Sequence, residues 1–497
     1  MNGIRFNAFA NLGLALEEVI IYWEKKGING EHQCLWVDQI CIDQSNPNER
    51  SHQVGLMRDI YAGAERVLAC LTECDSERSV VGIQWAIEQS QWMQRHLSMA
   101  DGRFIWRRPD PPVDLLDSAR YFTELEKISL STFQEGFVGF IPLCQRSWWK
   151  RAWICQEFIS AVEVDFLCSG LSMPWQDFAS VLTYLYKQMP ELSNPGSVPV
   201  RRRRSSLSSL STLDDESSAS TQTSFEPEQV NLERNQLDAV RNLFERKKCW
   251  TTPGDIKVWL EHSKCCETSD PRDKVFAFLG LASPGYRIEA DYSGLKSMVE
   301  LSIEITRKIL EFEKNLHFLY YIEKGRIVSD DSLLPSWVPE WTSTGVDGQF
   351  INFSRAMPAS VQLHPALASQ FTPVILPGNI LRLVGIKIDC LGGMEKSWTP
   401  GKKKGTKTSK GLYILWWPDD KIQPSDCLWY LPAAGYRNLL VLRRKSDNWL
   451  FLSVAYLYTT EKDNKCWATY IVDLIMGDDF AGLLEREGLI TEVIEIH

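Results

Sequence analysis

The stretch LWVDQICIDQSNPNERSHQVGLMRDIYAGAERVLACL, residues 35–71, decides the fold class of the N-terminal region. The apolar run at its start, Cys34–Ile42, predicts a buried strand and the loop that leaves it. Asn46-Pro47 marks a turn, and apolar residues then recur at helical spacing between Glu49 and Ala64. A second apolar run, Arg66–Leu71, predicts another strand. Strand, helix and strand at this spacing form a βαβ unit, so we expect a parallel sheet.

The alternation of helix and strand continues along the chain. A helical pattern covers Val81–His96, and a further helix is expected from Leu115. The segment WWKRAWICQEF, residues 148–158, predicts a helix that leads directly into AVEVDFLCSG, a strand ending at Gly170. This order of elements is typical of an α/β fold.

The rest of the chain changes character twice. The Ser- and Arg-rich residues 194–229 contain too little apolar surface to order themselves, which predicts a flexible insertion. Helical patterns return over 230–313, and after Pro335 short β-branched and aromatic runs predict a β-rich region, a small barrel or a sandwich. We therefore expect four parts: an α/β domain over 1–185, an insertion over 186–230, a helical region over 231–345 and a β-rich region over 346–497.

The composition excludes several classes of protein. The 497 residues carry a net charge of −10, whereas binding nucleic acid requires a continuous basic surface, so no nucleic-acid partner is expected. No apolar run approaches the roughly 18 residues of a membrane span. The 13 cysteines are scattered without paired C-x-x-C spacing. This indicates reduced, buried thiols in a cytoplasmic protein, and no metal site.

Two acids follow the first predicted strand. Ligands of open α/β sheets bind outside the carboxyl ends of strands, so Asp38 and Asp43 are candidates for contacting a sugar hydroxyl or a cation. The alternative is structural: Asp43 caps the following turn, and Asp38 pairs with a main-chain amide. Cys41 and His52 suggest a thiol nucleophile and its base, although a buried structural cysteine is the favoured interpretation.

The block DPRD, residues 270–273, has the chemistry of a helix start. Asp270 suits the N-cap, Pro271 the first helical position and Asp273 the third. Arg272 has no structural role in this scheme, so it is a candidate for binding a phosphate or pairing with a carboxylate. The segment LPSWVPEW, residues 334–341, predicts an extended strap that packs between domains, with ligand stacking as the alternative.

Glu157 is the acid that most needs an explanation. On a helical period it lies on one face with Trp153, while Ile154 and Phe158 lie on another side. A helix that is apolar on both sides is buried, so a carboxylate there is paired, neutralised or functional. The structural alternative is an ion pair with one of three arginines: Arg146, Arg151 or Arg272.

Three blocks together resemble the fungal heterokaryon-incompatibility (HET) domain family. They are residues 35–71, the segment WWKRAWICQEF and the segment DPRDKVFAFLGL. LPSWVPEW and the C-terminal IMGDDF are also similar to segments of such proteins. Members of the family usually begin with a strand of the form Ala-Leu-Ser-Tyr-x-Trp-Gly. This chain starts at Met1, just before a later segment, so that strand is expected to be absent.

The resemblance implies a role in fungal non-self recognition, growth arrest and cell death. The family is distantly similar to Toll/interleukin-1 receptor (TIR) domains, which implies a TIR- or flavodoxin-like parallel sheet. Plant-type TIR domains cleave NAD with a glutamate in a Trp-Cys-x-x-Glu helix, and WICQE keeps that spacing from Trp153 to Glu157. By this resemblance Glu157 is catalytic, and NAD is a substrate rather than a bound cofactor.

The same resemblance suggests the ligand contacts and the partners. Trp153 or Trp149 would stack on a flat base, Arg272 or Arg151 would hold the pyrophosphate, and Asp38 and Asp43 would support the site. The expected partners are a second copy of the chain or other incompatibility proteins. A rival hypothesis is a non-enzymatic, self-associating module in which these residues form a buried polar network, or an inactive truncated member of the family.

Overall fold

The structure is a computed structural model with two compact units. The first comprises residues 1–43 and 57–251, and the second comprises residues 44–56 and 252–497. Within them it describes residues 10–28, 34–73, 77–100, 103–106, 139–192, 227–322, 333–344, 372–391, 405–407, 413–415, 423, 425–431, 438–457 and 490–497. The helix expected from Leu115, the segment IMGDDF and residues 193–226 of the insertion lie outside these ranges.

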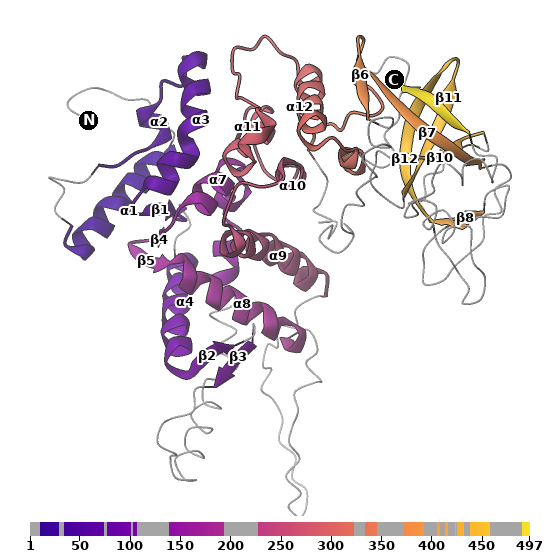
Figure 1. Cartoon of the computed structure of the whole chain (residues 1–497). Coiled ribbons are helices and arrows are strands. Elements are labelled where there is room, and N and C mark those ends of the chain that lie inside the picture. Colours follow the sequence, from indigo (N-terminus) through magenta and orange to yellow (C-terminus); the bar gives the residue numbers. More distant parts are fainter. Residues whose placement is uncertain are drawn as a thin grey trace, which may run out of the picture. The chain divides into compact units, whose positions relative to one another are not determined.

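The first unit is built mainly from helices around a small sheet (Figure 1). Its elements are α1 (Ala10–Lys26), α2 (Asp38–Cys41), the end of α3 (Pro47–Gly63), β1 (Val67–Cys70), α4 (Glu77–His96), β2 (Leu97–Ala100), β3 (Arg103–Trp106), η2 (Ser147–Lys150), α7 (Trp153–Ser160), β4 (Val164–Cys168), β5 (Leu171–Pro174), α8 (Trp175–Leu192) and α9 (Pro227–Cys249). The predicted α3, β1, α4, α7 and β4 are confirmed.

The sheet of this unit has three strands in the order β1-β4-β5. β1 runs parallel to β4, with Val67 opposite Val164, and β5 is antiparallel to β4. The chain turns back between β4 and β5 at Gly170, whose φ of +76° suits glycine. The α/β class and one parallel pair are therefore confirmed.

The strand predicted at Cys34–Ile42 is wrong. Residues 38–41 form the single helical turn α2, none of whose residues is buried. The amides of Ile40 and Cys41 both bond to the carbonyl oxygen of Val37, and the amide of Gln39 bonds to the Asp38 carboxylate. These local hydrogen bonds satisfy the main chain without a sheet neighbour.

Aromatic side chains form the core beneath η2 and α7. Phe178 of α8 stacks on Phe244 of α9 with ring centres 5.6 Å apart. Phe166 of β4 lies 4.9 Å from Phe178, and Phe158 of α7 lies 5.0 Å from Phe244. Trp149 joins this cluster, 5.3 Å from Phe166. Its indole nitrogen donates a hydrogen bond to the carbonyl oxygen of Leu143, so this side chain has a structural role.

A close approach of two helical segments makes Gly82 sensitive to any side chain. A Cβ atom at Gly82 of α4 would overlap the main-chain oxygen of Gly139, which cannot move as a side chain can. We expect Gly82→Ala to lower the free energy of unfolding by about 3 kcal/mol, as overpacking does. Urea unfolding measures this change.

Gly55→Ala is the matched control, because Gly55 is also helical and nothing lies within 4 Å of a Cβ atom built there. It should stabilise the protein by about 0.5 kcal/mol through helix propensity. Equal effects of the two substitutions would contradict the packing argument.

The second unit begins with helices and continues into a β-rich region, as predicted. Its elements are the start of α3, α10 (Ile256–Ser263), α11 (Asp273–Phe276), η3 (Leu279–Leu281), η4 (Pro284–Tyr286), α12 (Met298–Glu313), η5 (His317–Tyr321), β6 (Val374–Leu376), β7 (Ile380–Cys390), β8 (Gly405–Lys407), β9 (Tyr413–Leu415), β10 (Cys427–Tyr430), β11 (Asn438–Lys445), β12 (Asn448–Leu457) and β13 (Thr491–Ile496).

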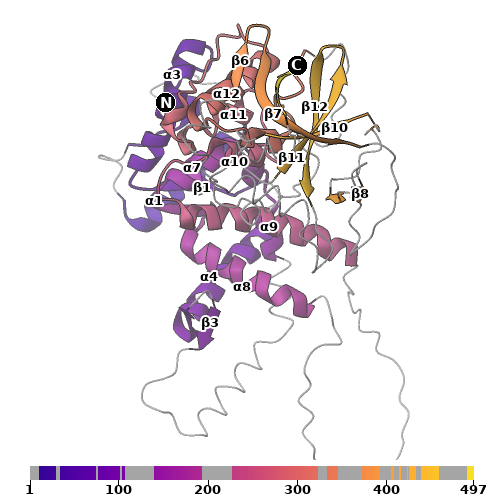
Figure 2. The same cartoon turned by 45° about the vertical axis from the view of Figure 1, so that its right-hand side comes forward.

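Five of these strands close into a ring. β7 pairs with β10, β10 with β11, β11 with β12, β12 with β13, and β13 returns to β7. Figure 2 shows β7, β10, β11 and β12 curving around a common interior. Leu383, Trp429 and Ile494 are buried there. Ring closure leaves these five strands without a long free edge. The β-rich region therefore contains a barrel rather than a sandwich.

The segment 334–341 packs as a strap within this unit. The fully buried Trp341 donates its indole hydrogen to the Thr306 hydroxyl of α12, and Trp337 donates to the carbonyl oxygen of Asn379 beside β7. The Ser336 amide bonds to the carbonyl oxygen of His497, and the Phe451 amide bonds to the Ser336 hydroxyl. Both indoles therefore have structural partners, which favours packing over ligand stacking.

Candidate functional site

α7 is buried except along one edge. Ile154, Phe158 and four more of its residues are buried, whereas Trp153 and Glu157 are only partly so. These two residues are four positions apart, so their side chains follow one another along the same face of the helix. The helix therefore presents an indole and a carboxylate together at its accessible edge.

The C-terminal end of α7 is held by a lysine from α9. The Lys247 ammonium donates hydrogen bonds to the carbonyl oxygens of Phe158 and Ala161. It also lies 5.0 Å from the ring centres of Phe158 and Trp175. Burial lowers its pKa to about 8. A cation at a helix C-terminus compensates the helix dipole and fixes the helix in place.

The Glu157 carboxyl group is strongly desolvated. Burial raises its pKa to about 7, the nearby Arg151 guanidinium opposes this rise, and the Asp38 carboxylate adds to it. Part of the side chain remains accessible, so the protein crowds the carboxyl group without sealing it. Among the described residues no hydrogen bond or ion pair to Glu157 is present. The ion-pair alternative therefore does not describe this group.

Tyr61 of α3 completes a cluster of titratable groups in the first unit. Its pKa is raised well above the ordinary value, first by burial and then by the charges of Glu157 and Asp38. Trp36 packs edge-on against Tyr61 with ring centres 5.5 Å apart. Asp38, Tyr61, Arg151 and Glu157 therefore lie close enough to influence one another.

The other arginines proposed as partners for Glu157 have different roles. Arg146 is buried and pairs with Glu73 at 2.6 Å, and it also bonds to Ser79. Arg272, in the second unit, binds the Asp270 carboxylate at 2.8 Å. Of the two alternatives for Arg272, the structure shows the pairing with a carboxylate, that of Asp270 two residues away.

The start of the DPRD block also differs from the expectation. Asp270 accepts a hydrogen bond from the Arg272 amide, but α11 begins only at Asp273 and lasts a single turn. Asp273 pairs with Arg50 at 3.3 Å and accepts a hydrogen bond from the Tyr292 hydroxyl. The Arg50 guanidinium lies 3.7 Å from the centre of the Tyr292 ring. The block is thus an ion-pair network that joins α3 to α11.

The two acids that follow the predicted strand separate in role. Asp38 accepts a hydrogen bond from the Gln39 amide, as the structural alternative proposed. Its negative charge also raises the pKa of Glu157. Asp43 is exposed. At the start of α3, Asn46 accepts the amides of Asn48 and Glu49.

The carboxyl ends of the parallel strands are occupied by a side chain of the protein. Glu18 of α1 is buried, and it accepts hydrogen bonds from the Thr72 hydroxyl after β1 and from the Gly170 amide after β4. The Ser169 amide bonds to the same Thr72 hydroxyl. An internal carboxylate thus fills the place where a ligand of an open sheet is expected.

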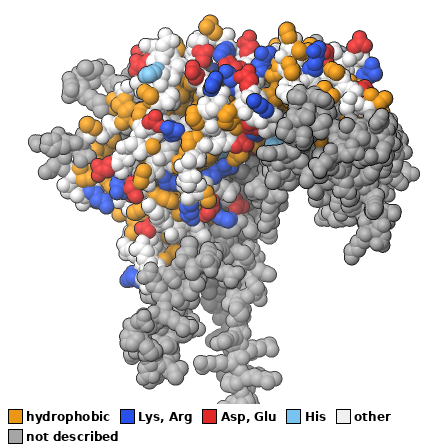
Figure 3. Space-filling model, viewed as in Figure 1, with side chains coloured by type: hydrophobic (Ala, Val, Ile, Leu, Met, Phe, Trp, Pro, Cys, Tyr) orange, Lys and Arg blue, Asp and Glu red, His pale blue; other side chains and the backbone are white. Residues whose placement is uncertain are grey.

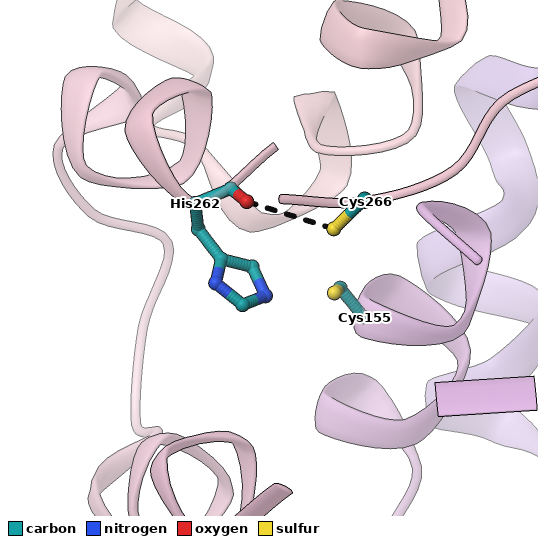
Figure 4. A group of neighbouring side chains, drawn as sticks. All are labelled: Cys155, His262 and Cys266. Carbon is teal, nitrogen blue, oxygen red and sulfur yellow. Dashed lines mark hydrogen bonds between the residues drawn. The ribbon is translucent and has the colours of Figure 1, made fainter. Parts of the chain in front are cut away.

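None of the described cysteines forms a disulfide, and Cys34, Cys41, Cys249 and Cys265 are exposed. A buried Cys41 was therefore the wrong expectation. Cys155 of α7 is buried, and in the second unit the buried Cys266 thiol donates a hydrogen bond to the carbonyl oxygen of His262 (Figure 4). Among the described helices none is long and apolar enough to cross a membrane.

Sequence reasoning missed Tyr61 and Arg50 as site residues. Tyr61 is one of several apolar positions on α3, and periodicity does not distinguish it from its neighbours. Arg50 adjoins the helix cap, and its partners at positions 270 and 273 are more than 200 residues away. Neither residue carries a local signal that points to these contacts.

Comparison with known proteins agrees with the first two of the three sequence blocks. A family model described as "Heterokaryon incompatibility protein (HET)" matches residues 4–157 and ends at Glu157. The chain is 27% identical over 332 residues to "Heterokaryon incompatibility protein 6, OR allele" of Neurospora crassa. The alignment covers 62% of this chain and 44% of that relative, so the chain spans less than half of the relative's length. No solved structure matches. Residues 4–157 of the chain are thus similar to the heterokaryon-incompatibility family.

Proposed function

We propose that this chain acts in fungal non-self recognition that ends in cell death, and that its HET domain cleaves NAD or a related nucleotide at Glu157. The observation that carries the catalytic part is the desolvated Glu157 carboxyl group at the open edge of α7, with a pKa of about 7. Carboxyl groups that have a shifted pKa and remain partly accessible are typical of catalytic positions. The preceding Trp153, the parallel pair β1–β4 and α7 before β4 support a TIR-like arrangement.

The reaction converts NAD and water into nicotinamide, ADP-ribose and a proton. Breaking the nicotinamide–ribose bond passes through an oxocarbenium-like state, as in glycoside hydrolysis. The ionised Glu157 carboxylate stabilises that positive charge, and it does so more strongly in a desolvated site than in water. Because the pKa of Glu157 is about 7, a large fraction of the groups is ionised at neutral pH.

The ligand contacts follow from the groups that surround Glu157. Trp153 offers an indole face to a flat base, and Asp38 is placed to accept a ribose hydroxyl. We assign the pyrophosphate to Arg151 rather than Arg272, since Arg151 is exposed in the same unit and acts on Glu157. The guanidinium of Arg272 is already bound by Asp270. Asp43 has no assigned contact.

Incubation of the purified chain with NAD, with nicotinamide release followed by chromatography, tests the catalytic part. We expect Glu157→Gln to lower the rate at least 100-fold, as the loss of an electrostatic catalyst does. Glu163→Gln is the matched control, because Glu163 lies just beyond α7 and its side chain is 40% exposed. It should change the rate less than twofold.

The rival function is a non-enzymatic module that associates with itself. A folded wild-type chain that releases no nicotinamide, even when it is concentrated enough to associate, would favour this rival. Equal rates for the wild type and Glu157→Gln would exclude Glu157 as the catalyst.

The proposed partner is a protein. On the face that Figure 3 shows, positive and negative side chains of the described residues are intermixed. A continuous basic surface, which phosphate binding requires, does not form there. We propose a second copy of the chain or another incompatibility protein as the partner, and the cytoplasm as the compartment in which thiols stay reduced.

A further inference from the structure

Two cysteines face each other across neighbouring strands of the barrel. Cys390 ends β7 and Cys427 begins β10, and the register pairs them directly. Their sulfur atoms lie 2.8 Å apart, and no disulfide joins them. Directly opposed residues of antiparallel strands have Cα separations of about 4.5–5.5 Å, within the range that a disulfide spans. No backbone movement is therefore needed to join them.

A β-bulge brings a lysine to the same pair of thiols. The register between β7 and β10 shifts between Leu428 and Trp429, which adds one residue to β7. Lys387 lies three positions before Cys390, and in a regular strand the two side chains would point to opposite faces. The extra residue places them on the same face, and Lys387 interacts with both sulfur atoms.

The pair has one accessible and one enclosed member. Cys390 is partly exposed, whereas Cys427 is buried. Burial raises the pKa of Cys427 to about 12, and the Lys387 ammonium opposes that rise. An accessible thiol next to a cation reacts first with an external oxidant, and the enclosed thiol is placed to react second.

We propose that Cys390 and Cys427 are a thiol–disulfide site that reacts with a low-molecular-weight disulfide such as oxidised glutathione. The Cys390 thiolate attacks one sulfur of that disulfide, forms a mixed disulfide and releases one glutathione thiolate. The Cys427 thiolate then attacks the Cys390 sulfur and releases the second. The two protons lost by the protein are taken up by the two glutathione thiolates, so the protein is oxidised by two electrons and glutathione disulfide is reduced.

The new bond joins residues 37 positions apart in the chain. It restricts the unfolded chain more than the folded one, so oxidation should stabilise the barrel. We expect the melting temperature of the second unit to rise by roughly 5 °C. This site is independent of the chemistry proposed at Glu157.

The test is equilibration of the full chain in buffers of graded reduced and oxidised glutathione, followed by alkylation and peptide mass analysis. We expect the peptides of Cys390 and Cys427 to become linked and two hydrogens lighter, with both thiols restored by excess dithiothreitol. In Cys427→Ser the reaction should stop at a Cys390–glutathione adduct. In Cys265→Ser, which removes an exposed thiol elsewhere, the linked peptides should form as in the wild type.

The wild-type measurement decides the matter even if a variant fails to fold. Alkylation of both thiols at every glutathione ratio would overturn the proposal. Linkage of Cys390 or Cys427 to a different cysteine would overturn it as well.

Discussion

Replacing Glu157 with glutamine is expected to raise the free energy of unfolding by about 2–3 kcal/mol above pH 8. The pKa of this group is about 7 in the folded chain, against an ordinary value of 4.5. A folded-state pKa above the unfolded one means that the folded chain binds the proton more tightly. Stability is therefore fully present below about pH 4.5 and is lost as the pH rises through 7. Glutamine cannot ionise, so the stability of the variant does not fall as the pH rises through 7.

The size of the effect follows from the shift in pKa. Each unit of difference in pKa corresponds to about 1.4 kcal/mol of stability. Because the side chain is partly accessible, we expect a change smaller than the pKa difference multiplied by this figure. Urea unfolding at pH 4 and pH 8 measures it: the wild type should be the less stable protein at pH 8, and the two should be nearly equal at pH 4. Glu163→Gln should show no such difference. A variant that is destabilised at pH 8 would mean that the Glu157 carboxylate is paired in the folded chain.

This prediction bears directly on the proposed function. Catalytic residues commonly lower the stability of the folded protein, because activity requires a charge that the fold would be more stable without. If Glu157 is the catalyst, the rate of NAD cleavage should rise with pH through an apparent pKa near 7 as the carboxylate forms. The rise of activity and the loss of stability would then follow the same ionisation.

The sequence predicted those elements whose side chains alternate with a clear period. The helix α4, the strand β4 and the edge of α7 that carries Trp153 and Glu157 were all visible as apolar patterns. The structure of Cys34–Ile42 was not predictable in this way, because a short apolar run is compatible with a strand or with a loop that contains a single helical turn. The hydrogen bonds to Val37 that decide between them depend on the surroundings of α2.

The partners of charged residues were harder to predict than the elements. For Arg272 the sequence left a phosphate or a carboxylate open, and the structure pairs it with Asp270, two residues away, at 2.8 Å. Conversely, Tyr61 and Glu157 lie 96 positions apart, and only the tertiary fold brings their charges together. Desolvation of Glu157 was predictable from periodicity, but the lack of an ion pair to it among the described residues was not.

Replacing Lys257 with methionine is expected to lower the free energy of unfolding of the second unit by about 4 kcal/mol. The Lys257 side chain is only 2% exposed and pairs with Glu313 of α12 and, at 3.0 Å, with Asp255 at the start of α10. The Tyr286 hydroxyl donates to the same Glu313 oxygen at 2.6 Å. Removing the cation leaves two neighbouring carboxylates without their shared counter-ion, and breaking a buried pair in this way costs about 3–5 kcal/mol.

Urea unfolding followed by tryptophan fluorescence measures the loss, and two further variants separate its causes. Lys257→Met combined with Glu313→Gln removes the unbalanced charge, so it should recover most of the stability, because an apolar or neutral replacement of a whole buried pair is close to neutral. Lys248→Met removes an exposed i,i+3 pair with Glu245, and it should change the free energy of unfolding by less than about 0.5 kcal/mol. If the single and double variants are equally unstable, the loss comes from the packing of the Lys257 stem and not from the charge left on Glu313. The recovery in the double variant is therefore the result that identifies an electrostatic connection between α10 and α12.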